Sequence, residues 1–77
     1  MGTFERLIKV FGVVFEGDVE TTSISPDSSI KDVGINSIGM LYMAMALEEE
    51  FSIKFNNDDF AKISTVNDVI KCIEEKL

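Results

Sequence analysis

The 77-residue chain has no histidine and no tryptophan, and only one cysteine and one proline. The lack of histidine removes the most common zinc ligand and the usual general base of enzymes. The single cysteine, Cys72, excludes a disulfide framework, and an unpaired cysteine is typical of the reducing cytosol. We therefore expect a cytoplasmic protein that is not an enzyme on its own.

Positively charged residues are scarce as well. Seven Lys and Arg residues stand against 14 Asp and Glu residues, which gives a net charge of −7. Binding to nucleic acid or to an anionic membrane depends on Lys and Arg, so neither partner is expected. The acidic balance favours protein partners with basic patches. Because like charges crowd a small volume, we also expect the acidic groups to have raised pKa values in the folded state.

Long apolar segments are also absent. No segment approaches the roughly 20 apolar residues of a transmembrane helix, and the N-terminus lacks the basic region and apolar run of a signal peptide. Membrane insertion is therefore not expected. A chain of this length forms one small domain with a thin core, for which a hydrophobic content of 45% is enough. We expect residues 1–77 to form a single, monomeric domain.

Two long stretches have apolar residues at spacings of three and four, which is typical of one face of a helix. The first covers residues 4–15, with Thr3 as the expected cap and Gly17 as the expected stop. Its apolar residues are Phe4, Leu7, Ile8, Phe11, Val14 and Phe15. The second stretch covers residues 37–51, and we expect Asn36 to cap it.

The rest of the chain predicts one more long helix, one short helix and a long loop. Apolar residues with a helical period recur over residues 66–77, and Asn56–Asp59 can start a short helix that carries Phe60. Residues 16–36 show no period, but four side chains can fix this loop to the core: Ile24, Ile30, Val33 and Ile35. The sequence thus predicts an all-α fold, a small bundle of three longer helices and one short helix, with a long loop after the first. Asn56–Asp59 lacks the alternating ligands and central glycine of a calcium loop, so no metal site is expected.

The second helix is apolar on more than one side. Its expected core face consists of Met43, Ala46, Leu47 and Phe51, bordered by Met40 and Ala44. The opposite side carries Ile38, Leu41, Tyr42 and Met45, and then Glu48 and Glu49. Either the long loop covers this opposite side, or it is a surface for a partner protein with the glutamates as a rim for basic residues.

Two segments resemble a known family. Gly34-Ile35-Asn36-Ser37-Ile38 is followed by Ala46-Leu47-Glu48-Glu49-Glu50-Phe51. This order resembles the acyl carrier protein family, whose motif is Gly-x-Asp-Ser-Leu followed by an apolar helix ending in Leu-Glu-Glu-x-Phe. The similarity continues without gaps to Ile73, and the first helix and loop match by pattern.

The resemblance implies that a separate phosphopantetheinyl transferase attaches 4′-phosphopantetheine from coenzyme A to Ser37, with Asn36 and Ile38 as the flanking motif residues. The thiol of that arm would carry acyl groups as thioesters between enzymes of fatty acid or related lipid or polyketide biosynthesis. Those acyl-loading and acyl-transferring enzymes would present basic patches to this acidic chain. The resemblance also implies an acyl pocket between the second and third helices, and by position its lining would be Met43, Ala44, Leu47, Phe55, Phe60 and Ile63.

Three positions depart from the family pattern. Asn36 replaces the aspartate of the motif, and Gly39 and Tyr42 stand where members of the family often carry acids. These departures favour a specialised carrier with its own enzymes. Two alternatives remain open. An aminoacyl or peptidyl carrier would have the same fold and the same serine, and an unmodified interaction module would have kept the bundle and lost the arm, an alternative that Asn36 favours.

Overall fold

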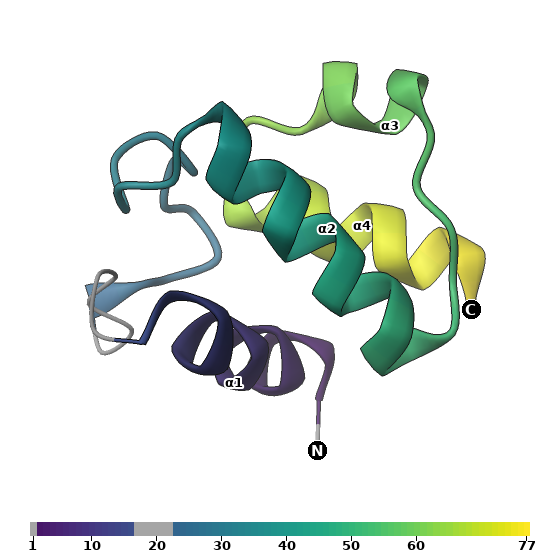
Figure 1. Ribbon diagram of the computed structural model, residues 1–77, viewed down its shortest axis with the longest axis horizontal. Coiled ribbons are helices and arrows are strands. Elements are labelled where there is room, and N and C mark those ends of the chain that lie inside the picture. The colour runs from purple at the N-terminus through teal and green to yellow at the C-terminus, as the bar shows by residue number, and fades with distance from the viewer. Residues whose placement is uncertain (1, 17–22) are drawn as a thin grey trace.

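The computed structural model describes residues 2–16 and 23–77 as a bundle of four helices (Figure 1). Their order is α1 (Thr3–Phe15), α2 (Ser37–Phe51), α3 (Asn57–Lys62) and α4 (Val66–Lys76). Helix α1 packs against both α2 and α4, and the short α3 lies on the other side of α2 from α1. This confirms the all-α architecture predicted from the sequence. None of the helices in the described part of the chain is long and apolar enough to cross a lipid bilayer.

The core lies where α1, α2 and α4 meet, and the long loop adds to it. The buried residues of the helices are Leu7, Phe11, Met43, Ala44, Leu47, Phe51, Val66, Val69, Cys72 and Ile73. Three of the expected loop anchors, Ile24, Ile30 and Ile35, are buried with them. Burial also raises the pKa of the Cys72 thiol, which favours its uncharged form.

Two details of the predicted core differ in the structure. Val14 is only half-buried and lines a hollow between α1 and α2 instead of joining the core. On α2, Ala44 is buried and Ala46 is half-buried, the reverse of the expected order. The reason is that α1 packs along one edge of α2, which leaves Ala46 at the border of their contact.

The ends of α1 also differ from the sequence prediction. The cap residue is Gly2, in an extended conformation, and Thr3 is the first residue of the helix. Phe15 ends the helix, followed by Glu16 in the left-handed conformation with φ 37°. The predicted stop, Gly17, lies outside the described residues.

Backbone hydrogen bonds fix the long loop to the start of α4. The N–H groups of Val66 and Asn67 donate to the carbonyls of Ser28 and Pro26, at 2.9 and 2.8 Å. In return, the N–H of Ile30 donates to the carbonyl of Ser64 at 2.9 Å. The first N–H groups of a helix have no partner within the helix, so the loop supplies acceptors that α4 lacks. Residues 26–30 of the loop are therefore held in place, although none of the named helices includes a residue of the described part of the loop.

Two capping boxes begin the C-terminal helices. In α3 the side chain of Asn56 accepts from the N–H of Asp59 at 2.9 Å, and the Asp59 carboxylate accepts from the N–H of Asn56 at 2.9 Å. Thr65 and Asp68 form the same reciprocal pair at the start of α4. Both boxes follow the sequence pattern of a polar cap with an acidic residue three positions later.

The capping boxes overturn the expected direction of the pKa shifts at Asp59 and Asp68. The backbone N–H of Asn56, together with Lys76 at 2.9 Å, lowers the pKa of Asp59 below its ordinary value of 3.8. The N–H groups of Thr65 and Ser64 lower the pKa of Asp68 in the same way. At these two carboxylates, local hydrogen bonds to the charged form outweigh the repulsion expected from the net charge of −7.

These shifts predict a loss of stability in acid. A carboxyl whose pKa is lower in the folded state stabilises the fold above its unfolded pKa, and this contribution is lost as the pH falls through the folded pKa. We expect Asp68→Asn and Asp59→Asn to lower the free energy of unfolding at pH 7 by about 0.5–1 kcal/mol each, as for a weakened cap. In chemical denaturation, the gap between each variant and the parent should narrow as the pH falls below the ordinary value of 3.8 and through the lowered pKa of the folded state. Asp58→Asn removes a charge from the same turn as Asp59 and is the control, and a gap that closes equally for Asp58→Asn would contradict this explanation.

Candidate functional site

The candidate site is the junction between the long loop and α2, which a tight turn prepares. The N–H of Gly34 donates to the carbonyl of Lys31 at 3.1 Å, and the N–H of Ile35 donates to the carbonyl of Ile30 at 3.3 Å. Gly34 has φ +93°, a conformation that residues with a Cβ rarely adopt. The turn directs Ile35 into the core, and the next two residues, Asn36 and Ser37, are exposed.

Asn36 caps α2 as predicted from the sequence. Its side-chain Oδ1 accepts a hydrogen bond from the N–H of Gly39 at 2.7 Å. Ser37 is the first residue of the helix and its side chain is exposed. A group attached to the Ser37 hydroxyl would therefore lie close to the unpaired N–H groups and the positive end of the helix dipole. This environment suits a phosphate.

Gly39 allows α1 to come close to the candidate site. A Cβ at Gly39 would lie 3.2 Å from a ring carbon of Phe15 and 3.3 Å from Oδ1 of Asn36. An acidic side chain at this position, as in many members of the family that the sequence resembles, would require Phe15 to move. The sequence alone gave no signal of this contact, because it joins two residues of different helices.

A hollow of about 630 Å³ opens beside Ser37. The long loop, the first turns of α2, and the segment from α3 to Ser64 form its walls. The lining residues are Ser29, Ile30, Lys31, Ile35, Asn36, Ser37, Met40, Leu41, Phe60, Ile63 and Ser64.

Only Phe60 and Ile63 of the six residues expected for an acyl pocket line this hollow. Met43, Ala44 and Leu47 are buried in the bundle instead, because the face of α2 that carries them is covered by the core. Phe55 is half-buried, with its ring 6.1 Å from that of Phe60, and does not line the hollow. Sequence position alone missed the contributions of Met40, Leu41 and the loop, whose distance from Phe60 depends on the tertiary fold.

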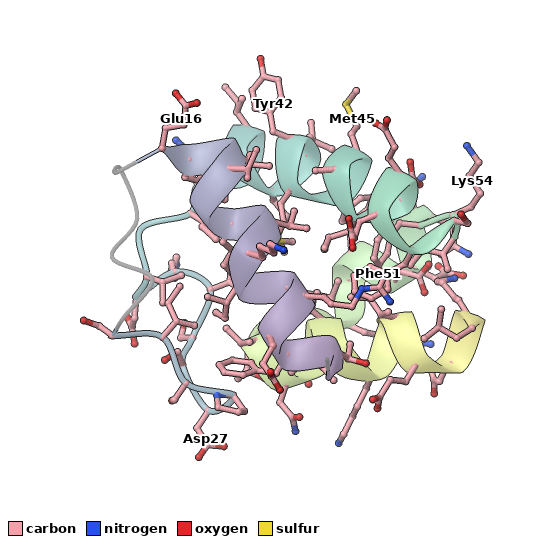
Figure 2. The ribbon with its side chains drawn as sticks, turned by 90° about the horizontal axis from the view of Figure 1, so that it is seen from below. Glu16, Asp27, Tyr42, Met45, Phe51 and Lys54 are labelled. Carbon is pink, nitrogen blue, oxygen red and sulfur yellow. The ribbon has the colours of Figure 1, made fainter. Side chains whose placement is uncertain are left out.

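The outward side of α2 is exposed to solvent. The exposed fractions of Ile38, Leu41, Tyr42 and Met45 are 63%, 56%, 60% and 65%. Figure 2 shows Tyr42 and Met45 pointing away from the bundle. Of the two explanations that the sequence left open, coverage by the loop is wrong for the part of the chain that the structure describes. We call these four residues the apolar α2 face.

The three glutamates at the end of α2 have different surroundings. Glu48 is half-buried, and its Oε2 accepts a hydrogen bond from the N–H of Phe55 at 2.7 Å. Glu50 forms an ion pair with Arg6 at 3.0 Å, and Arg6 also donates to the Glu50 carbonyl and stacks over the ring of Phe51. Glu49 is exposed, and within the described residues its side chain forms no hydrogen bond or ion pair. The predicted rim of Glu48 and Glu49 therefore has one outward carboxylate, Glu49.

Comparisons with known proteins identify the family to which this fold and this site belong. A family model described as "Phosphopantetheine attachment site" matches residues 5–73. The acyl carrier protein of Helicobacter hepaticus is 39% identical over 75 residues, which is 96% of either chain. The crystal structure of an acyl carrier protein from Thermotoga maritima superposes with a TM-score of 0.81 at 22% identity, over 94% of this chain and 82% of that one.

The chain therefore belongs to the acyl carrier protein family, as the sequence motif indicated. Proteins of this family are carriers and not enzymes, and they bear covalently attached 4′-phosphopantetheine. Among the described residues, no three His, Cys, Asp or Glu side chains lie close enough together to hold a metal ion.

The Asn36 cap generates a prediction about stability. Asn36→Ala should lower the free energy of unfolding by about 1 kcal/mol, because the N–H of Gly39 loses its acceptor. Asn36→Asp should keep the cap and raise the free energy of unfolding by about 0.3–1 kcal/mol, since a carboxylate interacts favourably with the helix N-terminus. Chemical denaturation of both variants at pH 7 measures the two effects. An Asn36→Ala variant as stable as the parent would show that the cap contributes nothing.

Proposed function

We propose that Ser37 is the attachment residue and that the chain carries acyl thioesters on a 4′-phosphopantetheine arm. The observation that carries this proposal is the exposed Ser37 at the first position of a capped helix, within a chain that the phosphopantetheine attachment family matches. Asn36 and Ile38 occupy the two positions that flank the serine in the family motif, where the family has Asp and Leu. The exposed hydroxyl is open to a transferase, and the helix N-terminus favours the negative charge of the phosphodiester.

Asn36 does not prevent this chemistry, although it replaces an aspartate. Its Oδ1 accepts the same kind of capping hydrogen bond that an aspartate accepts. The exposed position of Ser37 is therefore retained. This geometry favours a modified carrier over an unmodified interaction module, for which the replacement of the aspartate is the main argument.

The hollow beside Ser37 supplies a place for part of the acyl chain. Its apolar residues include Met40 and Leu41 from α2 and Phe60 and Ile63 from the opposite wall. An acyl chain that turns back from the arm would exchange water for these side chains. We keep Phe60 and Ile63 from the predicted pocket and add Met40 and Leu41 from α2.

The partners follow from this role and from the charge. A phosphopantetheinyl transferase would load Ser37 from coenzyme A, and enzymes of fatty acid or related lipid or polyketide biosynthesis would load and remove acyl groups. A net charge of −7 favours enzymes with basic patches. Asn36, Gly39 and Tyr42 favour a specialised carrier. We further propose that residues 1–77 act as one monomeric carrier domain in the cytosol, where a buried, unpaired Cys72 remains reduced.

Mass measurement tests the attachment site. Incubation of the chain with coenzyme A and the transferase of its source organism should increase its mass by one phosphopantetheinyl group. Ser37→Ala should gain no mass and should differ in stability from the parent by less than about 0.5 kcal/mol, because Ser37 is exposed. Ser64→Ala is a matched control, since Ser64 is exposed and lines the same hollow. A modified Ser37→Ala variant would disprove the assignment.

A further inference from the structure

Helix α3 contributes no fully buried residue to the bundle. It has six residues, and none of them is buried. A helix this short is marginal on its own, because the cost of starting it exceeds what so few hydrogen bonds return. Helix α1, by contrast, packs against both α2 and α4. The position of α3 therefore depends on the individual side chains that tie it to its neighbours.

Two side chains from other helices hold α3 and the segment before it. Glu48 of α2 accepts a hydrogen bond from the N–H of Phe55 at 2.7 Å. Nζ of Lys76, the last residue of α4, lies 2.9 Å from Oδ2 of Asp59. The side chains of Lys76 and Asp59 are only 24% and 14% exposed, so salt screens this ion pair less than a pair on the open surface. Asp59 is thus held by α4 as well as by its capping bond to Asn56.

Lys76 is a fixed point for this ion pair, because α4 is anchored in the core. Ile73 and Val69, one and two turns before Lys76, are both 0% exposed. Within residues 2–16 and 23–77, no other ion pair joins α3 to another helix. A movement of α3 away from the bundle must therefore lengthen or break the pair between Lys76 and Asp59.

Phe60 links this ion pair to the hollow beside Ser37. It directly follows Asp59 and lines the hollow together with Met40 of α2. An acyl chain too long for the hollow can extend further only by displacing the Phe60 ring. That displacement carries Asp59 away from Lys76, and separating two opposite charges that are mostly removed from water is unfavourable. The ion pair therefore opposes the entry of long chains and leaves short chains unaffected.

We propose that the ion pair between Lys76 and Asp59 limits the length of the acyl chain that the hollow can enclose, so that this carrier favours short acyl groups. This inference rests on the proposed function, because it concerns the cargo of the arm on Ser37. Lys76 does not line the hollow. It is a positioning residue that acts through Asp59 and Phe60.

Cleavage of the thioester by hydroxylamine tests this proposal, because a chain inside the hollow draws its thioester away from solvent. The transferase of the source organism would load the parent and each variant from butanoyl-, octanoyl- and dodecanoyl-coenzyme A. In the parent, we expect the octanoyl thioester to be cleaved more slowly than the other two. In Lys76→Met, the dodecanoyl thioester should be cleaved about threefold more slowly than in the parent, as for the loss of one ion pair. The butanoyl thioester should be cleaved at the same rate in both.

Two further variants are the controls. Lys76→Arg keeps a cation within reach of Asp59 and should restore the dependence on chain length that the parent shows. Lys71→Met removes an exposed lysine from the same helix and should also behave as the parent does. Circular dichroism should show that all three variants are folded.

The remaining outcomes separate this inference from the proposed function. Equal cleavage of the dodecanoyl thioester in Lys76→Met and the parent would overturn the inference, and so would faster cleavage of all three thioesters in Lys76→Met. If the parent gains no acylated arm, both proposals fail. If the parent is loaded but its octanoyl and butanoyl thioesters are cleaved equally fast, the hollow encloses no chain, and the inference fails while attachment at Ser37 stands.

Discussion

The structure depends on the pairing between the long loop and the first turn of α4. Pro26 and Ser28 supply carbonyl oxygens to N–H groups that would otherwise lack partners at the helix start, and Ser64 accepts from Ile30 in return. Ile30 and Ile35 are then held in the core. Because Ile35 directly precedes Asn36 and Ser37, this pairing also determines where α2 begins. The position of the candidate attachment site is therefore a consequence of contacts between other segments of the chain.

The sides of helix α2 lie in three different environments. Met43, Leu47 and Phe51 are buried in the core, Met40 lines the hollow beside Ser37, and the apolar α2 face meets solvent. Leu41 lies at the border and belongs both to the lining of the hollow and to the apolar α2 face. This division explains why the helix has apolar residues all round in a chain too short to enclose it. An apolar outward face costs little when it is small.

Local charges in this protein are governed by hydrogen bonds more than by the net charge. Asp59 and Asp68 accept from backbone N–H groups at helix starts, so their pKa values fall despite the excess of acidic residues. Glu48 and Glu50 are likewise used within the fold, by Phe55 and Arg6. A composition count gives the total charge correctly, but it does not show which carboxylates remain available to a partner. Only the positions of donors in the folded chain decide that.

The sequence by itself determined the class of fold, three of the four helix starts and the family. Helical periodicity depends on neighbours three and four residues apart, and the caps Asn36, Asn56 and Thr65 act within three residues, so these features are local. The tertiary structure decided which side of α2 is free, how the hollow is lined and which glutamates are already paired. These features join Ser37 to Phe60, Gly39 to Phe15 and Glu50 to Arg6, residues that are at least 23 positions apart in the sequence. No local pattern encodes such pairs, because their distance is set by how the helices pack.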